Sequence, residues 1–165
     1  MTCNAQPKIL AVIPARYAST RFPGKIIAPV AGKPVVYHTY LRACQAKLIS
    51  EAVIAADDQL VLDALRPYNV PVIMTRADHP SGTDRIAEVA ATSDADIIVN
   101  VQGDEPLIDP NTIDETIQPL LDQPDVVMST AKNLITEPEQ IDNPNVVKVV
   151  CDARGHAIYF SRCSI

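Results

Sequence analysis

Short apolar runs alternate with segments of helical periodicity along most of this chain, and that alternation constrains the fold more than any other feature. The apolar runs occupy residues 9–13, 51–56, 70–74 and 96–101. The segments with apolar residues at helical spacing occupy 33–48, 59–66, 81–90 and 109–121. Uninterrupted apolar strands separated by helices are typical of parallel sheets. We therefore predict an α/β fold with a doubly wound, mostly parallel sheet.

The last part of the chain has a different pattern. Residues 126–131, 146–151 and 157–161 are strand-like, and 152–155 is a turn sequence between the last two. This pattern predicts a β-rich C-terminal part with no helix after its final strand. Because such strands leave part of a sheet uncovered, we expect a chain that is cut short or needs a partner surface.

Composition narrows the class of protein. The 165 residues favour one domain, and the net charge of −6 argues against binding to nucleic acid or an anionic membrane. No stretch approaches the roughly 20 apolar residues of a membrane span, and the N-terminus does not resemble a signal peptide. The four cysteines are far apart in sequence, which makes zinc or a disulfide framework improbable. We expect a soluble cytoplasmic protein.

A cationic loop follows the first apolar run. It carries Arg16, Arg21 and Lys25 together with hydroxyl side chains and Gly24. Open α/β sheets bind phosphates at the carboxyl end of the first strand, where this loop is expected. It is not a Walker A loop, because Ile26 follows Lys25 where that motif has Ser or Thr. We predict a phosphate site held largely by side-chain cations.

A second polar segment, residues 102–105, follows the fourth apolar run and includes Gly103, Asp104 and Glu105. Its side chains should face the same crevice as the cationic loop. Carboxylates opposite a phosphate loop suit a divalent ion that also contacts phosphate oxygens, and Asp104 is the better candidate ligand. Alternatively, Asp104 caps the turn or pairs with a loop cation, and spacing alone does not decide between these interpretations.

A third segment, residues 75–85, follows the third apolar run and opens a helix at Ser81 and Gly82. Backbone N–H groups at such a helix start can meet an anion or a base carbonyl. The residues alone favour a simpler interpretation, a helix-capping turn with a surface network between Arg85 and Asp84. Upstream, the pair Asp57-Asp58 can cap the short helix at 59–66.

These motifs together resemble about the N-terminal two thirds of the 3-deoxy-manno-octulosonate cytidylyltransferase family. The resemblance rests on residues 13–25, 32–34, 74–79, 81–85, 99–106, 143–150 and 157–162. It implies a Rossmann-like nucleotidyltransferase fold. It also implies a reaction in which the anomeric hydroxyl of the acid sugar KDO attacks the α-phosphorus of CTP and pyrophosphate leaves. The product, CMP-KDO, serves lipopolysaccharide biosynthesis.

The resemblance also assigns roles to individual residues. It implies CTP binding by Pro14, Ala15, Arg16, Ser19, Lys25, Arg76, Ser81 and Gly82. Lys25, Arg16 and Asp104 would act in catalysis, Lys25 by offsetting charge on the attacked phosphorus and Asp104 by binding Mg²⁺. Gln102 and Arg162 would hold KDO, and the Arg162 guanidinium suits the carboxylate of the sugar.

The family continues past residue 165 with a second magnesium-binding aspartate, further KDO-binding residues and the main homodimer surface. The resemblance therefore implies a nucleotide-binding domain over residues 1–165, with the sugar-binding and dimerisation part beginning at 126–165. We expect this chain alone to have low activity or none. Two alternatives stay open: a nucleotide-binding half-site or relic that needs a complementary chain, and a cytidylyltransferase for a related acid sugar.

Overall fold

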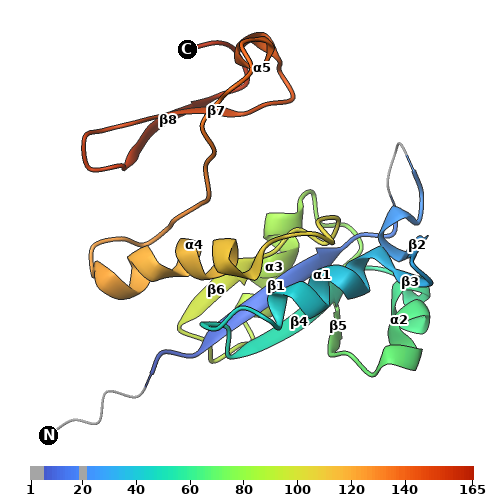
Figure 1. Cartoon of the computed structure of the whole chain (residues 1–165). Coiled ribbons are helices and arrows are strands. Elements are labelled where there is room, and N and C mark those ends of the chain that lie inside the picture. The colour runs from blue at the N-terminus through green and yellow to red at the C-terminus, as the bar shows by residue number, and fades with distance from the viewer. Residues whose placement is uncertain (1–5, 19–21) are drawn as a thin grey trace, which may run out of the picture. The chain divides into compact units, whose positions relative to one another are not determined.

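The structure is a computed structural model that describes residues 6–18 and 22–165. Ser19 and Arg21, two residues of the cationic loop, lie outside the described residues. The chain divides into two compact units, Met1–Ser129 and Thr130–Ile165 (Figure 1).

A four-stranded parallel sheet in the order β5-β4-β1-β6 forms the centre of the first unit. The strands are β1 (Ile9–Ala15), β4 (Glu51–Ala56), β5 (Val72–Met74) and β6 (Ile97–Asn100). Each of them coincides with one of the apolar runs, and every residue of the central strand β1 is buried. The predicted mostly parallel sheet is confirmed.

Helices cover both faces of this sheet. The helices α1 (Val35–Ala43), α2 (Gln59–Leu65) and α4 (Pro110–Asp122) pack on one face, and α3 (Gly82–Ala90) packs on the other. The predicted doubly wound arrangement is therefore confirmed. The longest of these helices, α4, has 13 residues. No helix in the described part of the chain has the length and hydrophobicity needed to cross a membrane.

The strand order places a topological switch point beside β1. From β1 the chain moves outward through β4 to β5, and it then returns to the other side of β1 as β6. Ligands of open α/β sheets bind outside the carboxyl ends of the strands at such a point. The loops that follow β1 and β6 are the cationic loop and the segment containing Asp104.

Capping residues set the helix starts much as the sequence predicts. The side chains of Asp58, Ser81 and Asp109 accept hydrogen bonds from backbone N–H groups in the first turns of α2, α3 and α4. The helix predicted from residue 33 begins at Val35 instead, because Lys33 and Pro34 form β3 (Lys33–Pro34), which pairs with β2 (Pro29–Val30). Two short 3₁₀ helices, η1 (Lys25–Ile27) and η2 (Arg66–Tyr68), complete the unit.

The second unit is a β-hairpin with a short helix, α5 (Glu139–Asp142). The strands β7 (Lys148–Cys151) and β8 (Ala157–Ser161) pair in antiparallel fashion, as predicted. The Asp152 carboxylate accepts the backbone N–H groups of Arg154 and His156 at 2.8 and 2.9 Å. Gly155 has a φ of 88°, which a side chain would strain. The turn chemistry therefore fixes the hairpin register.

The strand predicted at residues 126–131 is wrong. The described residues between α4 and β7 form no strand, and Val127 and Met128 are 89% and 84% exposed. A strand needs a neighbour for its backbone hydrogen bonds, and this segment pairs with none of the described strands. The prediction is based on the β-branched residues of this segment alone, and these do not make a strand without a pairing partner.

Candidate functional site

The close approach of the Asp104 segment to β1 depends on Gly103. Beyond β6, the Val101 N–H donates to Val12 O at 3.2 Å. A Cβ atom on Gly103 would lie 2.5 Å from Pro14 O and 2.9 Å from Ile26 Cδ1. Only glycine fits this contact, and it brings Asp104 to the carboxyl end of β1.

Lys25 and Asp104 form an ion pair at this edge of the sheet. Lys25 Nζ lies 2.8 Å from Asp104 Oδ2, and the two side chains are 49% and 48% exposed. The cationic loop turns back to reach this position, because the Gly24 N–H donates to Tyr17 O at 2.9 Å and Gly24 has a φ of 72°. Asp104 therefore pairs with a loop cation, one of the two interpretations that spacing left open.

The described residues contain no cluster of three or more His, Cys, Asp or Glu side chains that could hold a metal ion. Asp104 is a half-exposed carboxylate in the loop that follows the partly buried strand β6. Mg²⁺ is often held by one or two carboxylates together with substrate phosphates rather than by an all-protein cage. The donor set around Asp104 thus fits Mg²⁺ if phosphate oxygens complete the coordination.

Other predicted residues of the first loop differ in exposure. Pro14 and Ala15 are buried at the end of β1, whereas Arg16 is exposed directly after it. A ligand can therefore contact Pro14 and Ala15 mainly through their backbone. The Arg16 side chain is open to solvent at the switch point.

The N-terminus of α3 lies against the same strand end. A Cβ atom on Gly82 would lie 3.5 Å from Pro14 Cγ, so the start of the helix packs on β1. The N-cap Ser81 accepts the Asp84 N–H at 3.2 Å and donates to the Asp84 carboxylate. The structure thus brings Ser81 and Gly82 to the strand end beside which Gly103 also packs.

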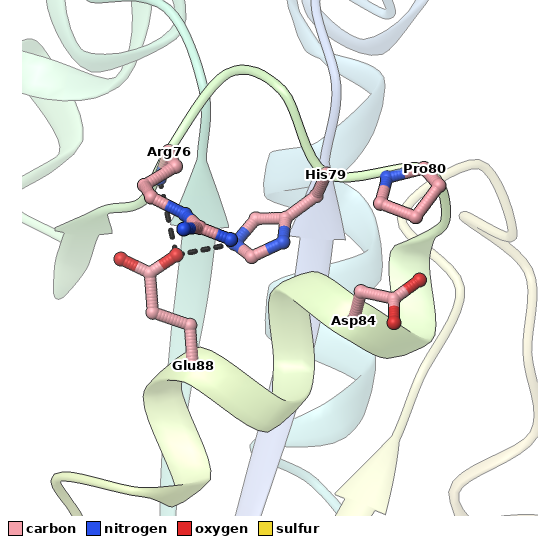
Figure 2. Close-up of a pocket in the computed structure, with 5 residues that line it drawn as sticks. All are labelled: Arg76, His79, Pro80, Asp84 and Glu88. Carbon is pink, nitrogen blue, oxygen red and sulfur yellow. Dashed lines mark hydrogen bonds and ion pairs between the residues drawn. The ribbon is translucent and has the colours of Figure 1, made fainter.

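Glu88 holds the loop that carries Arg76 (Figure 2). Its Oε2 atom accepts the Arg76 N–H at 3.1 Å and is also hydrogen-bonded to His79 Nε2. The His79 hydrogen bond, followed by that of Arg76, lowers the pKa of the Glu88 carboxyl from its ordinary value. The Arg76 guanidinium is exposed, with Nε 3.5 Å from Asp78 Oδ1. These residues line an open pocket together with Pro80 and Asp84.

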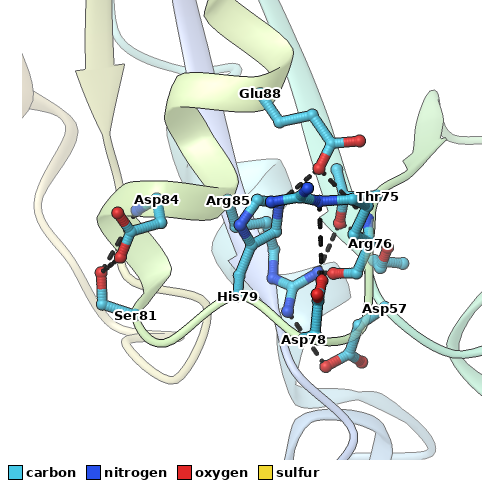
Figure 3. A network of polar contacts seen from close by, with 10 residues as sticks. Asp57, Thr75, Arg76, Asp78, His79, Ser81, Asp84, Arg85 and Glu88 are labelled. Carbon is cyan, nitrogen blue, oxygen red and sulfur yellow. Dashed lines mark hydrogen bonds and ion pairs between the residues drawn. The ribbon is translucent and has the colours of Figure 1, made fainter.

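Arg85 and Asp57 form a buried ion pair that the sequence interpretation missed (Figure 3). Arg85 Nη2 lies 3.2 Å from Asp57 Oδ2, and the side chains are only 2% and 5% exposed. The surface network predicted between Arg85 and Asp84 is wrong, since Asp84 pairs with Ser81 instead. One signal was available: Arg85 lies four residues before Val89, on the apolar face of α3.

The two predicted KDO ligands lie in different units. Gln102 is exposed in the first unit, where its Nε2 donates to Asn100 Oδ1 at 3.0 Å. Arg162 is exposed in the second unit, where its Nη1 donates to Pro144 O at 3.0 Å. Each of these side chains therefore forms a hydrogen bond within its own unit and lies at the surface of that unit.

Comparison with known proteins places this chain in a family. Residues 10–165 match the family described as cytidylyltransferase. The chain belongs to the cytidylyltransferase family. The matched range contains both the exposed Lys25–Asp104 pair and the buried Asp57–Arg85 pair.

Among curated relatives, a 3-deoxy-manno-octulosonate cytidylyltransferase from Solibacter usitatus is 56% identical over 158 residues. That match covers 96% of this chain and 63% of the relative. The enzyme of the same name from Geobacter metallireducens is 57% identical, covering 94% of this chain and 61% of the relative. The chain thus spans less than two thirds of the length of these cytidylyltransferases.

A solved cytidylyltransferase structure has the same fold. It is CMP:2-keto-3-deoxy-manno-octonic acid synthetase complexed with CTP, which is 43% identical to this chain with a TM-score of 0.90. The match covers 94% of this chain and 64% of that one. The Rossmann-like nucleotidyltransferase fold is therefore confirmed.

Proposed function

We propose that this chain is the nucleotide-binding part of a 3-deoxy-manno-octulosonate cytidylyltransferase, which transfers CMP from CTP to KDO for lipopolysaccharide biosynthesis. The observation that carries the proposal is the Lys25–Asp104 pair at the switch point of the sheet. A cation and a carboxylate side by side at this edge support binding of phosphate and of Mg²⁺, respectively. The relatives named above support the choice of nucleotide and sugar.

The cationic loop binds the triphosphate in this proposal. Arg16 is exposed directly after β1, and Lys25 is presented by the turn at Gly24. Lys25 contacts Asp104 through one half-exposed ammonium group, so phosphate oxygens can compete for it. Once bound to the α-phosphate, Lys25 offsets the negative charge that grows on the attacked phosphorus.

Asp104 holds Mg²⁺ in the proposed complex. The bound ion supplies charge neutralisation on the phosphate oxygens. The role of this chain is to fix the carboxylate at the strand end, which Gly103 does by packing directly against Pro14 O. The Asp104 carboxylate thereby lies close to the phosphates that Lys25 also contacts.

The loop after β5 and the start of α3 bind the cytosine. Gly82 has no side chain, so the N-terminal turn of α3 stays accessible beside Pro14. Backbone N–H groups at a helix start attract a carbonyl oxygen. The exposed Arg76 guanidinium adds a donor from the neighbouring loop. These groups can recognise the O2 carbonyl and N3 of cytosine.

The transfer itself needs alignment more than covalent catalysis. The anomeric hydroxyl oxygen of KDO forms a bond to the α-phosphorus, and the bond from that phosphorus to the bridging oxygen of the β-phosphate breaks. Pyrophosphate leaves with the bonding electrons, and the proton of the attacking hydroxyl passes to solvent. Gln102 is the proposed KDO-binding residue of the first unit, and the Arg162 guanidinium is of a kind suited to bind a carboxylate. We place the reaction in the cytoplasm, in a homodimer.

Calorimetric titration of the chain with CTP in Mg²⁺, with UTP and ATP as controls, tests the nucleotide assignment. CTP at 100 times its dissociation constant should stabilise the fold by about 2.7 kcal/mol. A titration with KDO in the presence of CTP and Mg²⁺ then tests the sugar, with a related acid sugar as the comparison, because turnover by this chain alone is expected to be low or absent. Equal affinity for all three nucleotides, or none, would overturn the proposal.

A further inference from the structure

The guanidinium of Arg85 connects segments from three different strand ends (Figure 3). Its Nη2 contacts Asp57, which directly follows β4. Its Nη1 donates to Arg76 O at 3.0 Å and to the Thr75 hydroxyl, both in the loop after β5. Arg85 itself belongs to α3, whose N-terminus packs on the end of β1. One buried side chain thus joins the parts of the proposed cytosine site.

Asp57 extends this connection to the cationic loop. Its Oδ2 faces Arg85, and its Oδ1 accepts the Tyr17 N–H at 2.8 Å. The Tyr17 carbonyl in turn accepts the Gly24 N–H, and this contact closes the turn that presents Lys25. A continuous series of hydrogen bonds therefore runs from Arg85 through Asp57 and Tyr17 to the residue before Lys25.

We propose that Asp57 and Arg85 are positioning residues. They fix the cationic loop, which binds the triphosphate, relative to the loop after β5, which binds the base. This inference rests on the proposed function, because it concerns the same nucleotide site. Neither side chain is exposed enough to contact a ligand directly. They act through the backbone of Tyr17 and Arg76, and a displacement of about 1 Å in such a site can reduce activity by about a hundredfold.

The planar fork of arginine is what this arrangement requires. Arg85 uses two different nitrogens, Nη1 toward Thr75 and Arg76 and Nη2 toward Asp57. Lysine keeps the charge that balances Asp57, but all of its donors are on one nitrogen at the end of a flexible stem. The substitution Arg85→Lys therefore preserves charge while removing one branch of the connection. This substitution therefore distinguishes an effect of positioning on CTP affinity from an effect of charge neutralisation.

The decisive experiment measures CTP affinity by calorimetry in parallel with thermal stability. For Arg85→Lys we expect affinity to fall by about tenfold to a hundredfold, and more than its change in melting temperature explains. The matched control is Val89→Ala, which removes a buried apolar contact one turn along the same helix. It should lower the melting temperature while leaving the CTP affinity of the folded chain unchanged.

Equal loss of affinity in both variants, or none in Arg85→Lys, would overturn the positioning role. Asp57→Asn gives a second variant in case Arg85→Lys folds poorly, because it keeps the acceptor for Tyr17 but loses the charge that faces Arg85. Additive effects of Asp57→Asn and Arg85→Lys on CTP affinity would also contradict the proposal, because coupled residues deviate from additivity.

A readout that needs no nucleotide separates this inference from the proposed function. Absence of CTP binding in the unsubstituted chain would contradict the proposed function alone. The Tyr17 amide proton is protected by Asp57, so its hydrogen exchange reports the order of the loop directly. Faster Tyr17 exchange in Arg85→Lys but not in Val89→Ala supports the connection, and equal rates in both would refute it.

Discussion

Two ion pairs at the same edge of the sheet differ sharply in exposure. Lys25 and Asp104 are about half exposed, whereas Asp57 and Arg85 are almost completely buried. The exposed pair has spare hydrogen-bonding capacity and borders solvent. Each charge of the buried pair instead contacts further protein groups: Arg85 reaches Arg76 O, and Asp57 accepts the Tyr17 N–H.

This difference in exposure distinguishes the side chains that contact a ligand from the side chains that hold those ligand-binding groups in position. An exposed pair contributes little to stability and exchanges partners easily. A buried pair is costly to break, because one removed partner leaves an uncompensated charge in the interior. We therefore expect substitutions at Lys25 to change ligand binding and substitutions at Arg85 to change the fold as well.

Removal of one buried partner should have the largest effect. Arg85→Met leaves the Asp57 carboxylate buried and unpaired, so the free energy of unfolding should fall by about 3–5 kcal/mol. Urea denaturation measures this loss, and Asp57→Asn combined with Arg85→Met should recover part of it by removing the charge. A single variant as stable as the unsubstituted chain would show that the pair is not buried in solution.

Gly103→Ala should have the next largest effect. The added Cβ atom would meet Pro14 O at 2.5 Å, and a backbone atom in a central strand cannot move away easily. We expect a loss of about 1–3 kcal/mol, measured by urea denaturation, because overpacking forces the backbone to shift. Gly82→Ala is the control, since its Cβ would make only ordinary contact with Pro14 at 3.5 Å. Comparable losses in both variants would refute the steric argument.

The lowered pKa of the Glu88 carboxyl predicts that the stability of the folded chain depends on pH. Hydrogen bonds from His79 and the Arg76 N–H lower its pKa below the ordinary 4.5 in the folded chain. Its contribution to stability is therefore complete above pH 4.5 and is lost as the pH falls through the lowered pKa. NMR titration should show the Arg76 amide shift following this protonation, and Glu88→Gln should abolish that transition.

A control for the pH prediction lies at the opposite end of β1. The Asp94 carboxyl also has a lowered pKa, caused first by its hydrogen bond with Lys8. Asp94→Asn should leave the acid transition of the Arg76 amide unchanged. Loss of that transition in Asp94→Asn would mean that it reports general acid unfolding rather than Glu88.

Substitution of the exposed pair should have the smallest effect on stability. Lys25→Met removes a contact between two half-exposed side chains, so the free energy of unfolding should change by less than about 1 kcal/mol. The same urea series as for Arg85→Met gives the comparison directly. A loss as large as that of Arg85→Met would remove the distinction between the two pairs.

The sequence predicts the local elements of this fold well and the contacts between distant elements poorly. The four apolar runs become the four parallel strands, and Asp58, Ser81 and Asp109 cap helices as their positions suggest. Such signals depend on neighbouring residues alone. The strand predicted at residues 126–131 fails for the opposite reason, because strand formation depends on a partner that composition does not specify.

The site shows the same division. The cationic loop and the Asp104 segment are adjacent at the switch point because both follow strands of one parallel sheet, whose carboxyl ends lie at the same edge. The Asp57–Arg85 pair joins residues 28 positions apart, and Asp57 looks like a second capping residue beside Asp58. Only the packing of α3 against the ends of β4 and β1 reveals its other role.

The most direct test of this account compares CTP affinity in the unsubstituted chain and in Asp104→Asn, with and without Mg²⁺. Without Mg²⁺ the variant should bind CTP more tightly, because it removes a carboxylate that competes with phosphate for Lys25. With Mg²⁺ the variant should bind more weakly, because the carboxylate that would hold the ion is gone. This reversal of order is the predicted result, and the same order under both conditions would contradict the proposed site.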